Sequence, residues 1–150
     1  MSKFYNLIIN EVKRETPDSI SIAFDIPNEL KNNFKYIQGQ YLTFLLQVNG
    51  EEIRRSYSLC SSPYINEPLR VAVKEVNGGK FSTYANKNLK AGDVLQTMMP
   101  TGNFFTELKP TQNKHYVAFA AGSGITPVYS ILKSVLQIEP QSKFTLIYSN

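Results

Sequence analysis

The sequence predicts a six-stranded antiparallel β-barrel with one small helix, followed by a single βαβ unit of an α/β fold. Residues 1–109 contain closely spaced strand patterns separated by short turns. The dipeptide Asn49-Gly50 between two of these strands is typical of a tight β-hairpin. Residues 110–150 differ, because they contain an apolar run, an amphipathic helix and a second apolar run.

The strands of the first region are predicted from β-forming residues, period-two alternation and the turn residues between them. They cover residues 4–12, 20–24, 40–48, 51–58, 69–76 and 94–99. A short helix is predicted with Ser82 as its N-cap and Leu89 as its last residue, because Ala91-Gly92-Asp93 follows. Closely spaced strands with one small helix indicate a closed barrel, which leaves no exposed strand edge.

The second region has the pattern of a βαβ unit, and the polar residues 110–114 predict a domain boundary between 1–109 and 110–150. Residues 116–121 predict a short buried parallel strand, residues 125–138 a helix and residues 143–149 a second strand. The apolar side chains expected on one face of the helix are those of Ile131, Leu132, Val135 and Leu136.

Composition limits the classes of function. The 150 residues suffice for one good core, and a net charge of +4 from scattered residues argues against a nucleic-acid partner. The single cysteine, Cys60, excludes an internal disulfide framework and a four-cysteine metal site, and we expect it to pack as a small apolar group. The sequence contains no apolar run of about 18 residues, the length that a membrane-spanning helix needs. It also shows no apolar signal region before the first predicted strand. No metal site is expected, and the expected location is the cytoplasm.

Residues Arg55-Ser56-Tyr57-Ser58 form the first candidate site motif. Alternation along a strand puts Arg55 and Tyr57 on one face. A guanidinium can bind a pyrophosphate through two parallel hydrogen bonds, and a phenol ring can pack on an aromatic cofactor. Ser58 at the strand end can offer its hydroxyl and backbone N–H to a ring nitrogen. The alternative is an ordinary edge strand with exposed arginine and tyrosine.

Two glycine turns precede predicted helices and are typical of phosphate-binding sites. The first is Gly78-Gly79-Lys80-Phe81-Ser82, and its alternative interpretation is a plain capped helix after a turn. The second is Gly122-Ser123-Gly124-Ile125-Thr126-Pro127, which directly follows a buried strand, as pyrophosphate turns do. It lacks the third glycine of the usual dinucleotide fingerprint. The alternative interpretation is therefore a plain strand-to-helix turn without a ligand. Two such turns suggest two nucleotides, and therefore a hydride relay.

Together the three motifs resemble those of the ferredoxin–NADP(+) reductase superfamily. Arg55-Ser56-Tyr57-Ser58 is similar to its flavin signature, Gly79-Lys80-Phe81-Ser82 to its pyrophosphate turn, and residues 122–127 to its pyridine-nucleotide turn. Order and spacing agree over the whole chain. The segment Val73-Lys74-Glu75-Val76 most resembles the reductase subunits of phenylacetyl-CoA epoxygenases and related oxygenases. The resemblance therefore implies a Greek-key flavin-binding barrel and the first βαβ of a nucleotide-binding domain.

The resemblance also implies a role for each site residue. Arg55 would bind the FAD pyrophosphate, Tyr57 would pack against the isoalloxazine, and Ser58 would bond the flavin N5 atom, so Tyr57 and Ser58 are the expected catalytic residues. The pyrophosphate would lie on Gly79, Lys80, Phe81 and Ser82. The nicotinamide nucleotide would lie on Gly122, Gly124 and Thr126. FAD is the expected cofactor, FMN is the alternative, and NAD(P)H is the expected hydride donor.

The expected activity is electron transfer from NAD(P)H through FAD to an iron–sulfur or ferredoxin-type acceptor, or an oxygenase component. The rival expectations are a flavin- or nucleotide-binding module without turnover, and a basic barrel that binds nucleic acid. Family members continue beyond the point that corresponds to Asn150, and epoxygenase reductases add an iron–sulfur domain, so the chain is expected to be a truncated form. A homodimer through residues 116–150 would cover the unpaired strand edge and sheet face.

Overall fold

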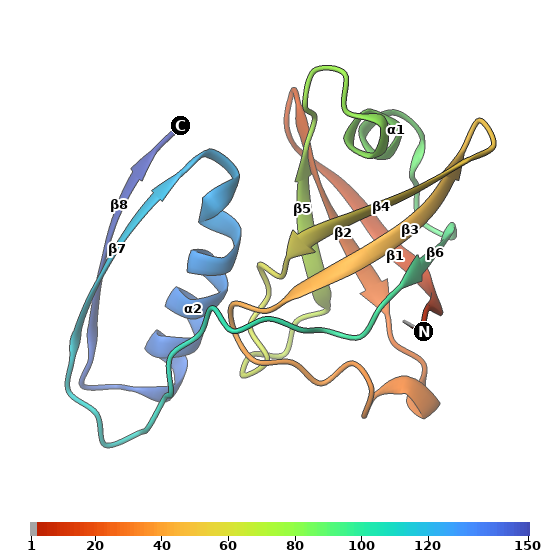
Figure 1. Cartoon of the computed structure of the whole chain (residues 1–150). Helices are drawn as coiled ribbons and strands as arrows, with labels where there is room; N and C mark the ends of the chain where they lie inside the picture. Colours follow the sequence, from red (N-terminus) through yellow and green to blue (C-terminus); the bar gives the residue numbers. More distant parts are fainter. Residues whose placement is uncertain (1–2) are drawn as a thin grey trace.

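Six strands form one antiparallel sheet in the computed structural model, which describes residues 3–150 (Figure 1). They are β1 (Tyr5–Thr16), β2 (Ser19–Asp25), β3 (Tyr41–Val48), β4 (Glu51–Ser58), β5 (Leu69–Lys74) and β6 (Val94–Thr97). Their spatial order is β4-β3-β6-β1-β2-β5. The neighbours β3–β6, β6–β1 and β2–β5 are distant in sequence, as the crossovers of a Greek key require. The predicted six-stranded barrel is confirmed.

The two outer strands of this sheet, β4 and β5, meet just after Ser58. An antiparallel bridge joins Leu59 to Val71, and the backbone N–H of Cys60 donates to the carbonyl oxygen of Arg70 at 2.9 Å. These bonds close the barrel around its apolar core. The fully buried side chains of the core include those of Leu7, Ile9, Ile20, Ile22, Phe24, Leu42, Phe44, Leu59, Val71, Val73, Phe81 and Leu95.

Strand boundaries differ from the prediction where a partner strand decides them. The first strand was expected to end at Val12, but β1 continues because its polar residues 13–16 pair with β2, up to the pair Thr16–Ser19. Strands β5 and β6 end at Lys74 and Thr97, two residues earlier than predicted. The predicted hairpin is confirmed: Asn49 has a φ of 51° and Gly50 a φ of 79°, which this tight turn requires.

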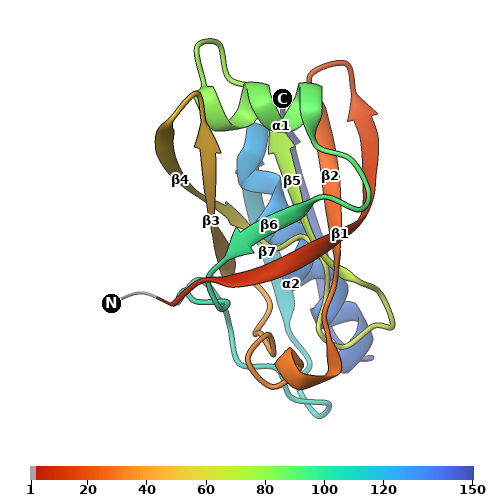
Figure 2. The same ribbon diagram turned by 90° about the vertical axis from the view of Figure 1, so that its right-hand side faces the viewer.

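Helix α1 (Lys80–Asn88) lies across one end of the barrel (Figure 2). Its side chains Phe81 and Ala85 are buried in the barrel core. The prediction that Ser82 caps this helix is wrong, because the N-cap is Gly79 and Ser82 lies within the first turn. The Ser82 hydroxyl instead accepts a hydrogen bond from the backbone N–H of Val76 at 3.1 Å. This bond ties the first turn of the helix to the segment that follows β5.

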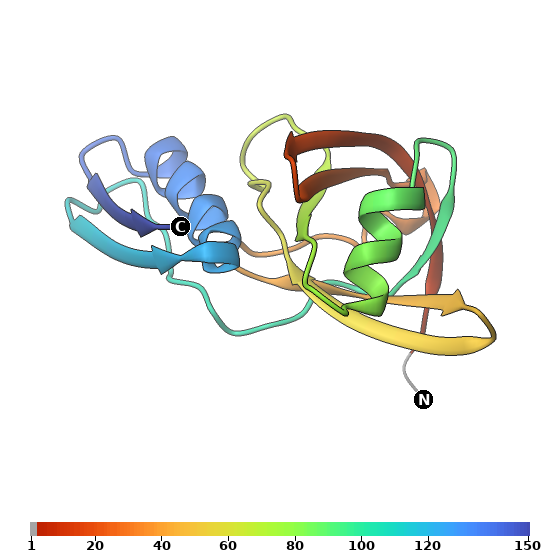
Figure 3. The same cartoon turned by 90° about the horizontal axis from the view of Figure 1, so that it is seen from above.

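The remaining elements form the predicted βαβ unit: β7 (His115–Ala121), the 3-10 turn η2 (Gly122–Gly124), α2 (Ile125–Ile138) and β8 (Lys143–Ser149). Strands β7 and β8 pair in parallel from His115–Lys143 to Ala121–Ser149. Seen from above, α2 lies between this small sheet and the barrel (Figure 3). A second short 3-10 helix, η1 (Asn28–Leu30), follows β2. None of the helices in residues 3–150 has the length and apolar content needed to cross a bilayer.

The predicted buried face of α2 is partly wrong. Val135 is fully buried, but Leu136 is 55% exposed. Two serines, Ser130 and Ser134, are fully buried instead. The reason is that α2 packs on two sides at once, against its own sheet and against the barrel, so a single apolar stripe does not describe its buried surface.

Glu139, just after α2, organises the connection between the barrel and the βαβ unit. Its carboxylate is fully buried and accepts hydrogen bonds from the hydroxyls of Ser142 (2.6 Å) and Tyr116 (3.0 Å). It also accepts from the Gln112 side chain (2.5 Å) and the Lys109 backbone N–H (3.2 Å). Burial alone would raise the pKa of Glu139, but these hydrogen bonds together lower it below its usual value.

The substitution Glu139→Gln is expected to lower the free energy of unfolding by about 2 kcal/mol at neutral pH, because hydrogen bonds to a charged group contribute about 1.5–3 kcal/mol. Since the pKa of Glu139 is lowered in the folded chain, its carboxylate stabilises the fold above the unfolded pKa of about 4.3. That contribution disappears as the pH falls through the lower folded pKa. The stability difference between Glu139→Gln and the unchanged chain should therefore begin to narrow at about pH 4.3 and close only as the pH falls through the folded pKa.

Urea unfolding over this pH range measures the gap. Glu107→Gln is the matched control, because Glu107 is an exposed residue of the same connection and forms a surface ion pair with Lys109 at 3.3 Å. It should change stability by less than about 0.5 kcal/mol. A gap between Glu139→Gln and the unchanged chain that stays constant with pH would contradict the assigned role.

Candidate functional site

A groove runs between the barrel and α2. Three adjoining cavities make it up, with volumes of about 450, 430 and 690 Å³, and Ala72 and Thr126 line all three. The first of them, termed the ring cavity, is lined by Tyr57 and Ser58 of β4 and by Ser123 and Thr126 of the second glycine turn. Two motifs that lie far apart in the sequence therefore open on one space of a size usual for small-molecule sites.

A further cavity of about 370 Å³, termed the turn cavity, continues from the ring cavity. Both are lined by Tyr57 and Val76. The turn cavity brings Arg55 together with Gly79, Lys80, Phe81 and Ser82. The residues of the first two motifs thus surround one continuous depression, with the arginine and the glycine turn at one end and Ser58 at the other.

Strand β4 positions the first motif. Alternation places Arg55 and Tyr57 on the same face as the buried Ile53. The ring of Tyr57 packs on Phe81, with 5.3 Å between ring centroids, and on Phe44, with 6.2 Å. Burial raises the pKa of Tyr57, and the charge of Arg55 acts in the opposite direction. The phenol therefore stays neutral at physiological pH, and its ring is held by two aromatic neighbours.

Arg55 itself is exposed, and its guanidinium donates to the carbonyl oxygen of Arg54 at 2.7 Å. Its neighbour Arg54 differs, because it points to the other face and pairs with Glu52 at 2.7 Å. Arg55 thus keeps most of its five N–H donors for a ligand in the turn cavity.

The first glycine turn requires glycine for its own conformation and packing. Gly78 has a φ of 72°, and a Cβ atom on Gly79 would lie 2.4 Å from the Ser82 hydroxyl oxygen and 2.9 Å from the Val76 carbonyl oxygen. Among residues 3–150 no side chain caps α1, so the N–H groups of its first turn have no side-chain partner. The Lys80 ammonium pairs with Glu51 at the tip of the β3–β4 hairpin. What the turn offers a ligand is mainly backbone N–H groups and the positive end of a helix dipole.

The second glycine turn connects β7 to α2. Gly122 has a φ of 50°, its carbonyl oxygen accepts from the Tyr148 hydroxyl at 3.2 Å, and the Thr126 hydroxyl donates to the Ser123 carbonyl oxygen at 3.1 Å. Gly122, Ser123 and Thr126 line the 430 Å³ cavity of the groove. Gly124 is the N-cap of α2 and lines none of the three cavities of the groove within residues 3–150. The predicted residues Gly122 and Thr126 therefore reach the groove, and Gly124 lies at the start of α2.

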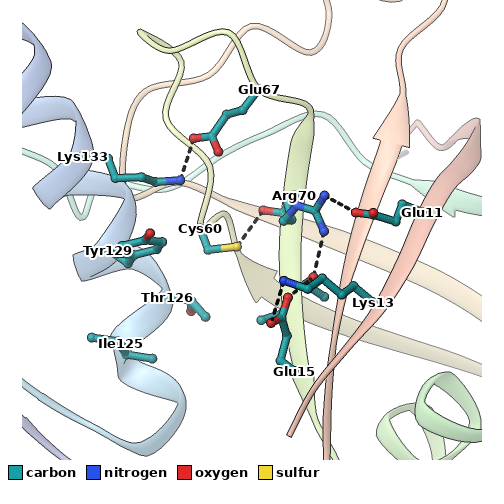
Figure 4. Close-up of a pocket in the computed structure, with 12 residues that line it drawn as sticks. Glu11, Lys13, Glu15, Cys60, Glu67, Arg70, Ile125, Thr126, Tyr129 and Lys133 are labelled. Carbon is teal, nitrogen blue, oxygen red and sulfur yellow. Dashed lines mark hydrogen bonds and ion pairs between the residues drawn. The ribbon is translucent and has the colours of Figure 1, made fainter.

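The 690 Å³ cavity, the largest of the groove, has a different character (Figure 4). Its charged side chains are paired with one another: Arg70 with Glu11 at 2.5 Å, Lys133 with Glu67 at 2.6 Å, and Lys13 with Glu15 at 3.4 Å.

Cys60 lines this cavity but is only 9% exposed. Burial raises the pKa of its thiol to about 11, so the thiol stays protonated at neutral pH. The expectation that Cys60 packs as a small apolar group agrees with its burial and its protonated thiol.

Some residues of the groove were not predicted. Ala72 and Lys74 of β5 line the ring cavity, and Lys74 also pairs with Asp18 at 3.6 Å. The sequence could have predicted their position, because alternation along β5 puts both side chains on the outer face, opposite Val71 and Val73. Two buried serines of α2, Ser130 and Ser134, were also not predicted, and they lie outside the linings of the three groove cavities.

Comparison with known proteins identifies the family. The sequence pattern of the oxidoreductase FAD-binding domain family matches residues 6–106. This chain belongs to that family. The matched stretch contains the first two motifs, and the resemblance based on all three is confirmed.

Individual relatives agree. The chain is 42% identical over 150 residues to a component of the 1,2-phenylacetyl-CoA epoxidase of Escherichia coli (strain K12), covering 100% of this chain and 42% of that protein. It is 38% identical to the 3-ketosteroid-9-alpha-monooxygenase ferredoxin reductase component of Rhodococcus rhodochrous, covering 96% of this chain and 40% of that protein. The chain thus spans about two fifths of the length of these curated relatives.

A crystal structure of a ferredoxin NADP+ reductase from Neisseria gonorrhoeae, with bound FAD and NADP, is similar in fold. The TM-score is 0.78 at 26% identity, and the match covers 100% of this chain and 58% of the other. The predicted combination of a flavin-binding barrel with an α/β unit is confirmed as this fold.

Proposed function

We propose that this chain forms the FAD-binding barrel and the first βαβ of an NAD(P)H-dependent flavin oxidoreductase, which passes electrons to an iron–sulfur or ferredoxin-type acceptor that serves an oxygenase. The observation that carries the proposal is the ring cavity, where Tyr57 and Ser58 of the barrel lie opposite Ser123 and Thr126 of the second turn. The first glycine turn lines the adjoining turn cavity and the second lines the ring cavity, and two nucleotide-type turns on connected cavities suit two nucleotides that exchange a hydride. The names of the curated relatives, a component of an epoxidase and the ferredoxin reductase component of a monooxygenase, support the acceptor class.

The residues present fit FAD. The turn cavity combines an exposed arginine with the start of α1, which has no side-chain cap, and both features suit a pyrophosphate. Arg55 would hold the pyrophosphate through charge-assisted hydrogen bonds. The N–H groups at the start of α1, from Gly79 to Ser82, would bind the same group. Tyr57 would pack against the flavin ring, and Ser58 would donate to its N5 atom.

FAD, when bound, accepts two electrons as hydride and releases them singly. The chain's own contribution is placement and electrostatics. Gly122, Gly124 and Thr126 would hold the nicotinamide nucleotide at the start of α2, on the far side of the ring cavity from Tyr57. The Ser58 donor would act as negative charge develops at the ring nitrogen.

We further propose that residues 1–109 and 110–150 are two domains. Residues 98–114 contain no strand or helix in the described structure apart from one bridge, Tyr41–Thr101. The cluster of buried apolar core residues lies entirely within residues 7–95.

An iron–sulfur acceptor would need ligands from outside this chain, which has a single cysteine. Self-association through residues 116–150 stays a prediction, and its surface would include Val117, Phe119 and Ile147, of which Phe119 is 75% exposed.

The purified chain is expected to bind FAD stoichiometrically, and NADH or NADPH is expected to bleach the flavin absorbance bands. The rival function is a flavin-binding module without turnover, and it predicts the same bands with no bleaching by either nucleotide. Absorbance spectroscopy before and after anaerobic addition of each nucleotide separates the two. Mass spectrometry of the released cofactor decides between FAD and FMN, and a chain that binds neither flavin would contradict the proposal.

A further inference from the structure

The barrel segment that follows Ser58 is buried and firmly held. Leu59, Ser61 and Ser62 are at most 1% exposed. The Leu59 N–H donates to the Gln40 carbonyl oxygen at 2.9 Å, and the Ser62 N–H donates to a Glu67 carboxylate oxygen at 2.7 Å. The Ser61 hydroxyl accepts from the Tyr36 hydroxyl at 2.9 Å and from the Arg70 N–H at 3.0 Å. The segment is therefore a rigid extension of the barrel that begins at the proposed N5 donor.

Helix α2 attaches to this segment through two buried serines. The Ser130 hydroxyl donates to the Ser61 carbonyl oxygen at 2.6 Å, and the hydroxyls of Ser62 and Ser134 lie 2.7 Å apart. The four residues Ser61, Ser62, Ser130 and Ser134 are termed the serine junction. Lys133 supports it from the same helix, with its ammonium 2.6 Å from the Glu67 carboxylate that also holds the Ser62 N–H.

The hydrogen bonds of the serine junction run in one direction. The Ser134 hydroxyl donates to the Ser130 carbonyl oxygen at 2.8 Å, so it must accept from Ser62. The Ser62 hydroxyl in turn accepts from the Tyr64 N–H at 3.2 Å. Each of these hydroxyls therefore donates one hydrogen bond. All the hydrogen bonds of the junction form together only when α2 has one position along its axis and one rotation about it relative to the barrel. Buried polar contacts specify geometry in this way more sharply than apolar packing does.

The junction lies close to both halves of the proposed site. Ser61 is three residues after Ser58 along the chain. Ser130 is six residues after Gly124, the N-cap of α2, which corresponds to about 9 Å of helix. Interfaces between domains of one chain are usually polar and allow relative motion. A directional junction at this point removes that freedom between the second glycine turn and the Ser58 segment.

We propose that Ser130 and Ser134 are positioning residues, which fix the second glycine turn relative to Ser58 and thereby set the distance for hydride transfer. The positioning itself follows from the contacts above, and its effect on hydride transfer rests on the proposed function. Neither serine lines the ring cavity, so both act through the junction and not by touching a ligand. The class of ligand they serve is a reduced nicotinamide nucleotide docked on α2.

The first test uses the ligand-free 150-residue chain and therefore does not depend on the proposed function. Backbone amide exchange at residues 59–62, followed by NMR, is expected to speed up at least about tenfold in Ser130→Ala and in Ser134→Ala. Ser142→Ala is the matched control, because Ser142 is also a buried serine of the βαβ unit but bonds Glu139 and not the barrel. Exchange at the unchanged rate in both junction variants would overturn the inference.

The second test uses the FAD-loaded chain. Reduction of the flavin by NADH or NADPH is expected to slow about tenfold in Ser134→Ala, with unchanged FAD affinity and an unchanged rate of reduction by dithionite. Equal slowing in Ser142→Ala would mean a general loss of structure and would overturn the positioning role. Failure of the unchanged chain to bind FAD, or to be reduced by either nucleotide, would count against the proposed function, while amide exchange still decides the junction.

Discussion

Replacement of Arg55 by alanine is expected to weaken FAD binding by about tenfold to several hundredfold. The guanidinium lines the turn cavity with Gly79 and Ser82, where a pyrophosphate would lie. A hydrogen bond to a charged group contributes about 1.5–3 kcal/mol, and about 1.4 kcal/mol corresponds to a factor of ten in affinity. Lysine at this position should restore only part of the affinity, because an ammonium does not reproduce the two parallel hydrogen bonds of a guanidinium.

Fluorescence titration of the chain with FAD measures this effect. Arg54→Ala is the matched control, because Arg54 is the adjacent arginine of β4 but pairs with Glu52 at 2.7 Å on the other face. It should leave the FAD dissociation constant within about twofold of the original, because exposed ion pairs contribute little. Equal affinities for Arg55→Ala and the unchanged chain would remove Arg55 from the site.

The parts of the fold that the sequence predicted are those that local chemistry decides. Asn49-Gly50 forms its hairpin because both residues adopt the positive φ that the turn needs. Tyr57 and Arg55 share a face because a strand alternates. The glycines of both turns lie next to helix starts, as their spacing predicted.

The parts that escaped prediction depend on partners distant in sequence. Strand β1 reaches Thr16 because β2 pairs with Lys13, Arg14 and Thr16, which lack the apolar alternation of the earlier part of the strand. Ser82 is not a cap, because its hydroxyl accepts a hydrogen bond from the backbone N–H of Val76, two residues after β5. Ser130 and Ser134 are buried only because the barrel presents Ser61 and Ser62 to α2. The cavities of the groove likewise form only where the barrel and the βαβ unit come together. The sequence motifs therefore predict some of the residues that line the cavities but not the shape of the cavities.

Replacement of Ser58 by alanine is expected to leave the fold and FAD affinity nearly unchanged and to slow flavin reduction by NADH or NADPH about ten- to a thousandfold. A donor to the atom where charge develops helps mainly in the transition state, and loss of one such donor in other enzymes has effects at the upper end of this range. Ser58 lies at the end of β4, paired with Tyr41 and followed at once by the bridge that closes the barrel. Its backbone is therefore held in place with or without the hydroxyl.

Ser58→Thr is the variant that makes the test decisive, because it keeps the hydroxyl and its β-branched side chain suits a strand. Stopped-flow reduction should recover most of the original rate in Ser58→Thr and not in Ser58→Ala. Reduction of Ser58→Ala at the original rate would dismiss the role given to the hydroxyl. Equal loss in both variants would assign the effect to the shape of the ring cavity, where Ser58 lies beside Tyr57 and opposite Thr126, and would leave the backbone N–H as the donor to the flavin.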